Sequence, residues 1–343
     1  MLVLGIETSC DETAVALVKK NKSKFGGKII KEIVLSQAKK HEIFGGVVPE
    51  ISSREHILSL KKITQTILKQ SNIKVSNIDA FAATCGPGLN GGLLIGSNFA
   101  KSLSIGLNKP FFAINHLQAH ILVSRVKKKI EFPFLVLLIS GGHTQLIIAK
   151  AYNKFEIIGE TIDDAVGEAF DKTAKILGLG YPGGPKIEML AKKSKRQNIV
   201  LLPRPMIRKK NLDFSFSGLK TAVRRKVENK NSKDKNSDLA YSFQLAVSEC
   251  LLDRCSKGIN KFLKLFGKGH FLMAGGVASN KYLREKMIEL CNKKDMTFFA
   301  PDPRLCVDNA SMVAWTAIER IVNGEKGDSI KFLPNPRWSI NEL

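Results

Sequence analysis

The chain has 343 residues, of which 54 are Lys or Arg and 31 are Asp or Glu, so its formal net charge is +23. This length suits two lobes that each bury a core, and a hydrophobic content of 44% excludes a mainly disordered chain. No apolar stretch approaches the roughly 20 residues that a bilayer crossing needs, and the first residues lack the basic start of a signal peptide. We therefore expect a cytoplasmic protein that does not associate with membranes.

The positive charge has two interpretations. A surplus of this size favours phosphate-rich partners, and nucleic acid is the obvious candidate. The chain also has 42 lysines against 12 arginines, which is typical of compositional drift in a lysine-favouring genome. Composition alone leaves both interpretations open.

Two hairpins of the same form, 2–18 and 134–149, begin the two halves of the chain. Each consists of an apolar strand, a small polar loop, a threonine and a second apolar strand. Because the copies lie about 130 residues apart, they indicate a duplicated domain. The Lys- and Gly-rich segment 19–31 is predicted to be a hairpin excursion between early strands.

Helices and strands alternate after each hairpin. The apolar spacing predicts a helix over 57–70, a strand over 79–84, helices over 91–107, 163–178 and 240–266, a strand over 270–274, and helices over 280–291 and 310–322. The polar segment 224–238 is interpreted as a flexible surface loop. Alternation of this kind in two copies predicts an α/β protein of two lobes.

His116 and His120 are candidate metal ligands. On a helix, residues four positions apart share one face at a separation that suits chelation. The pair lacks the glutamate of a metalloprotease helix, and taken alone such a pair is more often a coincidence than a site. Asp308 could supply a third ligand or could instead cap the predicted helix over 310–322. Two histidines and one carboxylate with open positions fit iron(II) or zinc held for substrate binding.

Three glycine-rich turns, at 86–92, 140–142 and 274–280, are candidates for phosphate binding. Small residues let backbone N–H groups approach a phosphate, and a helix N-terminus favours its charge. None of the turns matches a Walker or a Rossmann motif. Three such turns in a duplicated α/β chain nevertheless favour a nucleotide between the lobes.

Acidic side chains occupy one face of the predicted helix over 163–178. Asp164, Glu168 and Asp171 follow helical spacing. The face could be simply solvated, or it could accept hydrogen bonds from ribose hydroxyls or a basic partner. The spacing does not choose between these interpretations.

Long motifs follow one another in a fixed order along the chain. They are Gly-Ile-Glu-Thr-Ser-Cys-Asp-Glu-Thr at 5–13, Gly-Gly-Val-Val-Pro-Glu at 45–50, the pair His116 and His120, Ser-Gly-Gly-His-Thr-Gln at 140–145, and further segments at 167–174, 213–221, 274–277 and 308–309. In this order they resemble the family of bacterial tRNA adenosine threonylcarbamoyltransferases (TsaD), once labelled glycoproteases. The resemblance runs from Leu2 to about Trp338, nearly the whole chain.

The resemblance implies the two-lobed, duplicated actin/sugar-kinase/Hsp70-like (ribonuclease H-like) ATPase fold. We expect an N-terminal lobe over 1–110, completed by a C-terminal helix at about 309–325. The C-terminal lobe is expected over 111–308, with helical insertions at about 160–250 and with the nucleotide and metal cleft between the lobes. The resemblance also implies that the chain binds one divalent metal ion per subunit, iron(II) in preference to zinc, through His116, His120 and Asp308.

The resemblance further implies a set of substrate-binding residues, with Asp171 on the ribose and the turn at Ser140 on the phosphate. The full set is Leu138, Ile139, Ser140, Gly141, Gly142, Asp171, Gly184 and Asn280. Two departures from the family pattern are visible. Asn115 stands where a histidine is often found, and Gln118 replaces an acidic residue. Neither is a ligand position, so the expectation of metal binding stands.

The implied activity is transfer of the threonylcarbamoyl group from threonylcarbamoyl-AMP to the N6 amine of adenosine at position 37 of tRNA. The tRNAs concerned read codons that begin with A. Asp11 is our candidate for the general base, with Glu12 second, although both acids could merely shape the hairpin loop. The implied partners are tRNA, threonylcarbamoyl-AMP, a paralogous inactive subunit (TsaB-like) and a small ATPase (TsaE-like).

Two other classes of function stay open from the sequence. One is an ATP-hydrolysing or kinase member of the same fold, and the other is a tRNA-binding scaffold without catalysis. A protease is disfavoured because no nucleophile–base set is present. The basic clusters at 19–31, 192–196, 208–210 and 224–235 are the candidates for tRNA contact.

Overall fold

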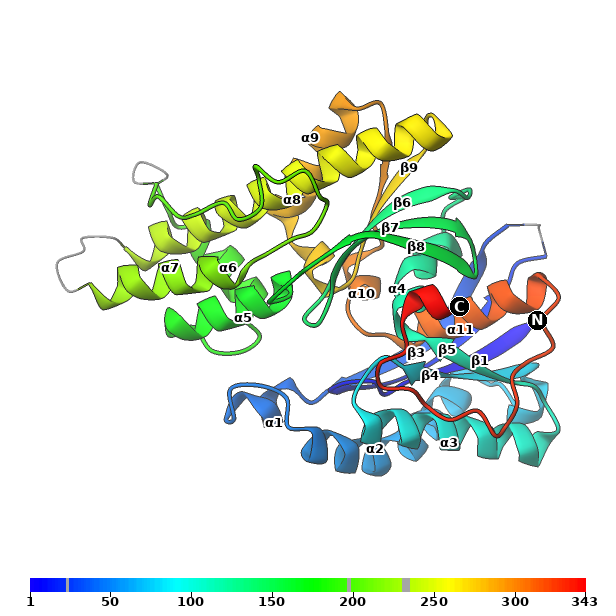
Figure 1. Ribbon diagram of the computed structural model, residues 1–343. Coiled ribbons are helices and arrows are strands. Elements are labelled where there is room, and N and C mark those ends of the chain that lie inside the picture. The colour runs from blue at the N-terminus through cyan, green and yellow to red at the C-terminus, as the bar shows by residue number, and fades with distance from the viewer. Residues whose placement is uncertain (23–24, 196–198, 230–234) are drawn as a thin grey trace. The chain divides into compact units, whose positions relative to one another are not determined.

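The structure is a computed structural model that describes residues 1–343 except 23–24, 196–198 and 230–234 (Figure 1). The chain forms two units. Unit 1 comprises Met1–Ile130, Ala151–Lys154 and Pro301–Leu343, and unit 2 comprises Glu131–Lys150 and Phe155–Ala300. Both ends of the chain therefore belong to unit 1, and unit 2 is an insertion into it.

Unit 1 is built on a five-stranded sheet in the order β3-β2-β1-β4-β5. Antiparallel pairing joins β1 (Leu2–Glu7) to β2 (Glu12–Lys20) and β2 to β3 (Gly27–Ser36). Parallel pairing joins β1 to β4 (Ala80–Gly86) and β4 to β5 (Phe111–Asn115). The β2–β3 hairpin confirms the predicted excursion over 19–31, of which residues 23–24 lie outside the described part of the chain.

Helices cover both faces of this sheet (Figure 1). α2 (Pro49–Ser71) and α3 (Asn90–Leu107) lie on one face, and α11 (Ala310–Val322) lies on the other. α11 approaches β1 so closely that a Cβ atom at Gly5 would clash with the carbonyl oxygen of Ala310. This close approach requires glycine at position 5. The shorter helices of the unit are α1 (Ala38–Glu42), α4 (His116–Leu122) and α10 (Pro303–Cys306).

The segment 111–122, β5 and α4, lies in unit 1, although the sequence placed the lobe boundary at 110. The physical reason is strand pairing, because β5 completes the sheet beside β4.

Apolar residues at helical spacing on α2, namely Leu60, Ile63 and Ile67, are at most 4% exposed and pack in the core of unit 1.

The C-terminal tail, residues 325–343, has only a short 3-10 turn at its end and is held to unit 1 by hydrogen bonds. The Asn335 N–H donates to the carbonyl oxygen of Cys85 at 2.8 Å. The Asn115 side chain donates to the carbonyl oxygen of Trp338 at 3.0 Å. The tail is thereby fixed at the ends of β4 and β5, next to the start of α4.

Unit 2 contains a second five-stranded sheet, in the order β10-β9-β6-β7-β8. β6 (Phe134–Ile139) pairs antiparallel with β7 (Thr144–Ala151) and parallel with β9 (His270–Ala274), which pairs parallel with β10 (Thr297–Phe299). β8 (Lys154–Glu160) lies beside β7. Each unit thus combines an antiparallel hairpin with two further parallel strands, which confirms the predicted duplication.

The helices of unit 2 are α5 (Val166–Ile176), α6 (Gly183–Ala191), α7 (Ser217–Glu228), α8 (Asn236–Phe266) and α9 (Lys281–Lys293). The prediction of a flexible loop over 224–238 is wrong at both ends, because 224–228 belong to α7 and 236–238 belong to α8. Residues 230–234 lie outside the described part of the chain. α7 forms because Leu219 and Val223, four positions apart, bury one face while cations occupy the others. No helix among the described residues is long and apolar enough to cross a membrane.

Candidate metal centre and acidic loop

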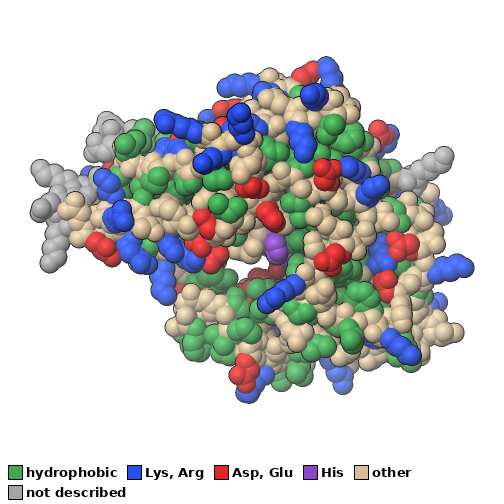
Figure 2. All heavy atoms as spheres, viewed as in Figure 1, with side chains coloured by type: hydrophobic (Ala, Val, Ile, Leu, Met, Phe, Trp, Pro, Cys, Tyr) green, Lys and Arg blue, Asp and Glu red, His purple; other side chains and the backbone are tan. Residues whose placement is uncertain are grey.

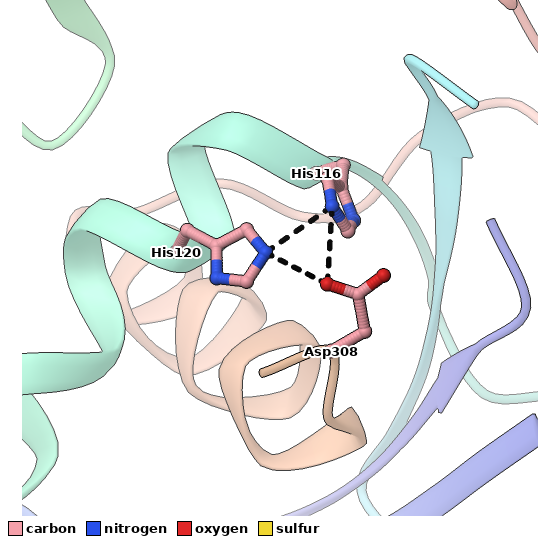
Figure 3. Close-up of side chains that lie close together, drawn as sticks. All are labelled: His116, His120 and Asp308. Carbon is pink, nitrogen blue, oxygen red and sulfur yellow. Dashed lines mark hydrogen bonds and ion pairs between the residues drawn. The ribbon is translucent and has the colours of Figure 1, made fainter. Parts of the chain in front are cut away.

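His116, His120 and Asp308 meet in unit 1 with their ligand atoms facing one another (Figure 3). The Nε2 atoms of the two histidines are 3.2 Å apart. Oδ1 of Asp308 lies 3.0 Å from Nε2 of His120 and 3.6 Å from Nε2 of His116. Within the described part of the chain, this is the one group of three or more such side chains with metal-binding spacing.

Two capped helix ends place these ligands. The Asn115 side chain accepts hydrogen bonds from the N–H groups of Leu117 and Gln118, so α4 begins directly after β5 and carries both histidines on one face. Asn309 caps α11 by accepting from the Met312 N–H at 2.9 Å. The alternative that Asp308 is the cap is therefore wrong, and its carboxylate is left for the histidines.

A buried carboxylate lies behind His116. Oε2 of Glu7, at the end of β1, is 3.2 Å from Nδ1 of His116, and Glu7 is fully buried. Because an ionised carboxylate only accepts, Nδ1 carries the proton and donates it to Glu7. When Nε2 gives up its own proton, its lone pair points towards His120 and Asp308, the arrangement found in carboxylate–histidine–metal sites.

The electrostatics of this group favour a cation. Burial alone would lower the pKa of His116, but the Asp308 and Glu7 carboxylates outweigh it and raise the pKa to about 9. Burial would raise the pKa of Glu7, and His116 outweighs it so that the pKa is lowered. Ligands about 2.0–2.2 Å from one ion and 90–109° apart lie about 3.0–3.5 Å from one another. The donor set therefore fits a divalent metal in distance, tautomer and charge.

The loop from β1 to β2 brings two more acids near this group. Asp11 is 5% exposed and Glu12 is partly buried. Burial raises the pKa of Glu12 well above its ordinary value, and the Asp308 and Asp11 carboxylates and a hydrogen bond with Asp11 add to the shift. A carboxyl group with a raised pKa is a better proton acceptor than an ordinary one when it is ionised.

In unit 2, three of the eight predicted substrate-binding residues lie on one turn, which is hydrogen-bonded to the start of α5. Ser140, Gly141 and Gly142 form the turn between β6 and β7, and both glycines are exposed. The N–H of Gly167, at the start of α5, donates to the carbonyl oxygen of Ser140 at 3.2 Å. Farther along α5, Oδ1 of Asp171 accepts from the N–H of Gly183 at 2.6 Å.

That hydrogen bond places Asp171 at the start of α6, beside Gly184, where a Cβ atom would meet nothing within 4 Å. The remaining predicted residues are enclosed. Leu138 and Ile139 are fully buried in β6. The side chain of Asn280 caps α9 and donates to Gln244, so both of its polar atoms have protein partners.

The acidic face predicted for 163–178 is divided. Asp164 precedes α5 rather than lying on it, and Lys172 forms ion pairs with Asp164 and Glu168. Asp171 is directed to α6 instead. The three acids therefore do not form one row, because the helix begins at Val166.

Sequence reasoning missed two residues that contact His116. The first is Glu7, whose position at the buried end of β1, just before a polar loop, was a signal for a buried carboxylate. The second is Ser9, whose N–H donates to Oε1 of Glu7 at 2.6 Å and whose Oγ lies 3.2 Å from Nδ1 of His116. No sequence pattern points to Ser9.

The comparison with known sequences gives a family for the chain. Residues 28–315 match the model of the family TsaD, tRNA N6-adenosine threonylcarbamoyltransferase. A relative of that name from Agrobacterium fabrum is 46% identical over 99% of this chain and 94% of its own length. Another from Brucella anthropi is 45% identical over 100% of this chain and 96% of its own.

Solved structures agree in fold at low identity. HypF from T. kodakarensis is 13% identical with a TM-score of 0.62, over 94% of this chain and 48% of that one. Component A of the Acidaminococcus fermentans (R)-2-hydroxyglutaryl-CoA dehydratase is 15% identical with a TM-score of 0.53, over 93% and 99%. The fold is the actin/sugar-kinase/Hsp70-like ATPase fold, as predicted. The chain belongs to the family of tRNA N6-adenosine threonylcarbamoyltransferases.

Proposed function

We propose that the chain transfers the threonylcarbamoyl group from threonylcarbamoyl-AMP to the N6 amine of adenosine at position 37 of tRNAs that read codons beginning with A. The observation that carries the proposal is 46% identity with a transferase of this name along 99% of the chain. The geometry of the acids and histidines in unit 1 is consistent with it.

The chemistry explains what the protein has to supply. The exocyclic amine of adenosine is a weak nucleophile because its lone pair is delocalised into the purine. The protein must therefore hold the amine close to the carbamoyl carbon and accept its proton as the C–N bond forms. It must also stabilise the negative charge that develops on the carbonyl oxygen and on the departing AMP.

His116, His120 and Asp308 would hold the divalent metal, and Glu7 would keep His116 in the tautomer that binds it. A metal bound there would supply Lewis-acid stabilisation of oxygen atoms. Two nitrogens and one carboxylate oxygen are the donor set of iron(II) sites with open positions, which favours iron(II), and zinc takes the same donors. His116→Ala should remove metal and transfer together, and unchanged metal content by elemental analysis would contradict the assignment.

Asp11 and Glu12 would share the role of general base. The hydrogen bond between the two carboxyl groups and the raised pKa of Glu12 support a pair that holds and passes a proton. Asp11→Asn and Glu12→Gln should each lower the single-turnover rate by about 100-fold or more, while threonylcarbamoyl-AMP still binds. A near-normal rate in both variants would refute the role and leave the acids as loop residues.

The turn at Ser140–Gly142, Asp171 and Gly184 would contact the adenylate in unit 2. The exposed glycines of the Ser140–Gly142 turn and the free space beside Gly184 support phosphate binding there. The substrate roles of Leu138, Ile139 and Asn280, and the nucleotide and metal cleft expected between the lobes, stay predictions.

The tRNA would contact basic residues of unit 2. Figure 2 shows Lys and Arg side chains gathered over α7. Arg225 and Lys226 line a groove of about 670 Å³ together with Pro203, Ser217, Gly218, Thr221, Ala222 and Asn229. Within the described part of the chain, neither cation forms an ion pair, so both are available to phosphates. Of the basic clusters predicted to contact tRNA, Lys24, Arg196, Lys230 and Lys233 lie outside the described residues.

The decisive experiment is transfer from threonylcarbamoyl-AMP to unmodified tRNA by the purified chain, alone and with a TsaB-like subunit and a TsaE-like ATPase. We expect N6-threonylcarbamoyladenosine in digested tRNA when the partners are present. Phosphate release from ATP without tRNA, and no modified nucleoside, would favour an ATP-hydrolysing or kinase member of the fold instead. tRNA binding without either product would favour a scaffold.

A further inference from the structure

His56, on α2, lies fully buried against the acidic loop of unit 1. Its Nε2 atom is 3.0 Å from the carbonyl oxygen of Cys10, and its Nδ1 atom is 2.8 Å from Oγ1 of Thr13. The histidine therefore contacts the residues immediately before and after the pair Asp11 and Glu12. With no exposed surface, it can touch neither substrate nor solvent.

The contacts define the state of the ring. A carbonyl oxygen only accepts hydrogen bonds, so Nε2 of His56 carries the proton and donates it to Cys10. Nδ1 then accepts from the hydroxyl of Thr13. Burial lowers the pKa of His56, which favours this neutral form. The hydroxyl of Ser52, one turn earlier on α2, also donates to the carbonyl oxygen of Cys10.

A second arm of the network reaches the same loop through Gln37. The Gln37 N–H donates to the carbonyl oxygen of Asp11 at 2.9 Å. The side-chain oxygen of Gln37 accepts from Nε2 of His41 at 3.2 Å, and its amide group donates to the carbonyl oxygen of Ser52 at 3.4 Å. Nδ1 of His41 accepts from the Val48 N–H at 3.2 Å. Each donor in this network of hydrogen bonds thus meets an acceptor.

The carbonyl groups of Cys10 and Asp11 belong to the peptide planes on either side of Asp11. Hydrogen bonds to both carbonyls fix the directions in which the side chains of Asp11 and Glu12 leave the backbone. α3 closes the loop from another side, because a Cβ atom at Gly92 would clash with the carbonyl oxygen of Thr8. The acids therefore sit on a backbone held by buried polar groups rather than on a free loop.

We propose that His56 is a positioning residue for threonylcarbamoyl transfer, which it supports by holding the Cys10 carbonyl and the Thr13 hydroxyl so that Asp11 and Glu12 face the reacting amine. This inference rests on the proposed function. A displacement of about 1 Å in a reacting geometry can cost about 100-fold in rate. A residue of this kind affects kcat and leaves the binding of substrates nearly unchanged.

The test compares two substitutions of His56 in the complete enzyme with its partners. His56→Leu removes both hydrogen bonds, whereas His56→Gln keeps an amide N–H near the position of Nε2. We expect His56→Leu to lower kcat by about 100-fold, with the KM values for tRNA and threonylcarbamoyl-AMP within about threefold of the wild type. The kcat of His56→Gln should be at least tenfold higher than that of His56→Leu.

Thr64→Val is the matched control. Thr64 is buried on the same face of α2, two turns later, and its hydroxyl bonds only to the carbonyl oxygen of Leu60 in its own helix. It should keep the wild-type kcat. Equal losses in His56→Leu and Thr64→Val, equal losses in His56→Leu and His56→Gln, or a wild-type kcat in folded His56→Leu would each overturn the proposal.

If His56→Leu does not fold, Thr13→Val removes one hydrogen bond to the ring and takes its place, with an expected fall in kcat of about tenfold. Hydrogen exchange of the peptide that covers residues 8–13 gives a readout without catalysis. Exchange there should accelerate in the folded His56 or Thr13 variant and not in Thr64→Val, and unchanged exchange would contradict the proposal. Absence of transfer by the wild type would instead refute the proposed function itself.

Discussion

Replacing Glu7 with Gln should weaken metal binding at His116, His120 and Asp308 without removing a ligand. Glu7 is fully buried, and its two oxygens accept from the Ser9 N–H, the Thr84 hydroxyl and Nδ1 of His116. A glutamine has one oxygen and one NH₂ group. If its oxygen keeps the bond to Ser9, its NH₂ group faces Nδ1–H of His116, and two donors meet.

The magnitude follows from the hydrogen bond that the substitution removes. His116 would either keep only the neutral Ser9 hydroxyl as an acceptor or move its proton to Nε2, the atom that faces the other two side chains. A hydrogen bond to a charged group contributes about 1.5–3 kcal/mol, and about 1.4 kcal/mol corresponds to tenfold in affinity. We therefore expect the dissociation constant of the metal to rise about 10- to 100-fold, the range usual for residues that orient ligands.

Competition of zinc or iron(II) between the protein and a chromophoric chelator measures this change. Glu32→Gln is the control, because Glu32 is another carboxylate of unit 1, partly buried, that accepts from the Ser311 N–H at the start of α11 and does not contact His116. Its metal affinity should match that of the wild type. Wild-type affinity in Glu7→Gln, or equal losses in the two variants, would refute the role of Glu7 as the group that sets the tautomer.

Three further predictions follow from single interactions. The pKa of His56 is lower in the folded than in the unfolded protein, so the unfolded chain binds the proton first as the pH falls. The free energy of unfolding should therefore fall below about pH 6.5, by up to about 1.4 kcal/mol per pH unit. Urea titrations at pH 7.5 and 5.5 should show a smaller fall in His56→Gln than in the wild type. Asn309→Ala should lower the free energy of unfolding by about 1 kcal/mol because the cap of α11 is removed. It should also lower the affinity for metal, because Asn309 fixes the backbone beside Asp308. Unchanged metal affinity would contradict this second expectation. Arg225→Glu with Lys226→Glu should weaken tRNA binding at least tenfold and reduce the slope of log K against log salt by about 1 for each phosphate that the protein no longer binds, whereas an unchanged slope would mean that α7 does not bind tRNA.

Local patterns predicted the repeated parts of the fold well. The hairpins beginning at Leu2 and Phe134 were visible because strand periodicity and a polar turn are short-range signals. The histidine pair was visible for the same reason, since four positions on a helix define one face. α7 was missed because the run Arg224, Arg225 and Lys226 is charged, and only two apolar residues, Leu219 and Val223, mark the buried face.

The environment of the ligands could not be predicted in this way. Glu7 and His116 are 109 positions apart, and His56 and Cys10 are 46 apart. A single sequence carries no signal for such pairs, because each is created by the packing of whole elements. Asn309 rather than Asp308 caps α11, because the helix begins at Ala310 as predicted and the residue directly before it is Asn309.

The tail that bonds to Asn115 has a consequence for how the protein is made. His120 and Asp308 are 188 positions apart, and Asn115 and Trp338 are 223 apart. On the ribosome, the whole of unit 2 emerges before either distant partner does, so unit 2 has time to fold while the first 130 residues wait for the end of the chain. Non-local closures of this kind are slow. The group of His116, His120 and Asp308 is therefore among the last parts of the protein to form.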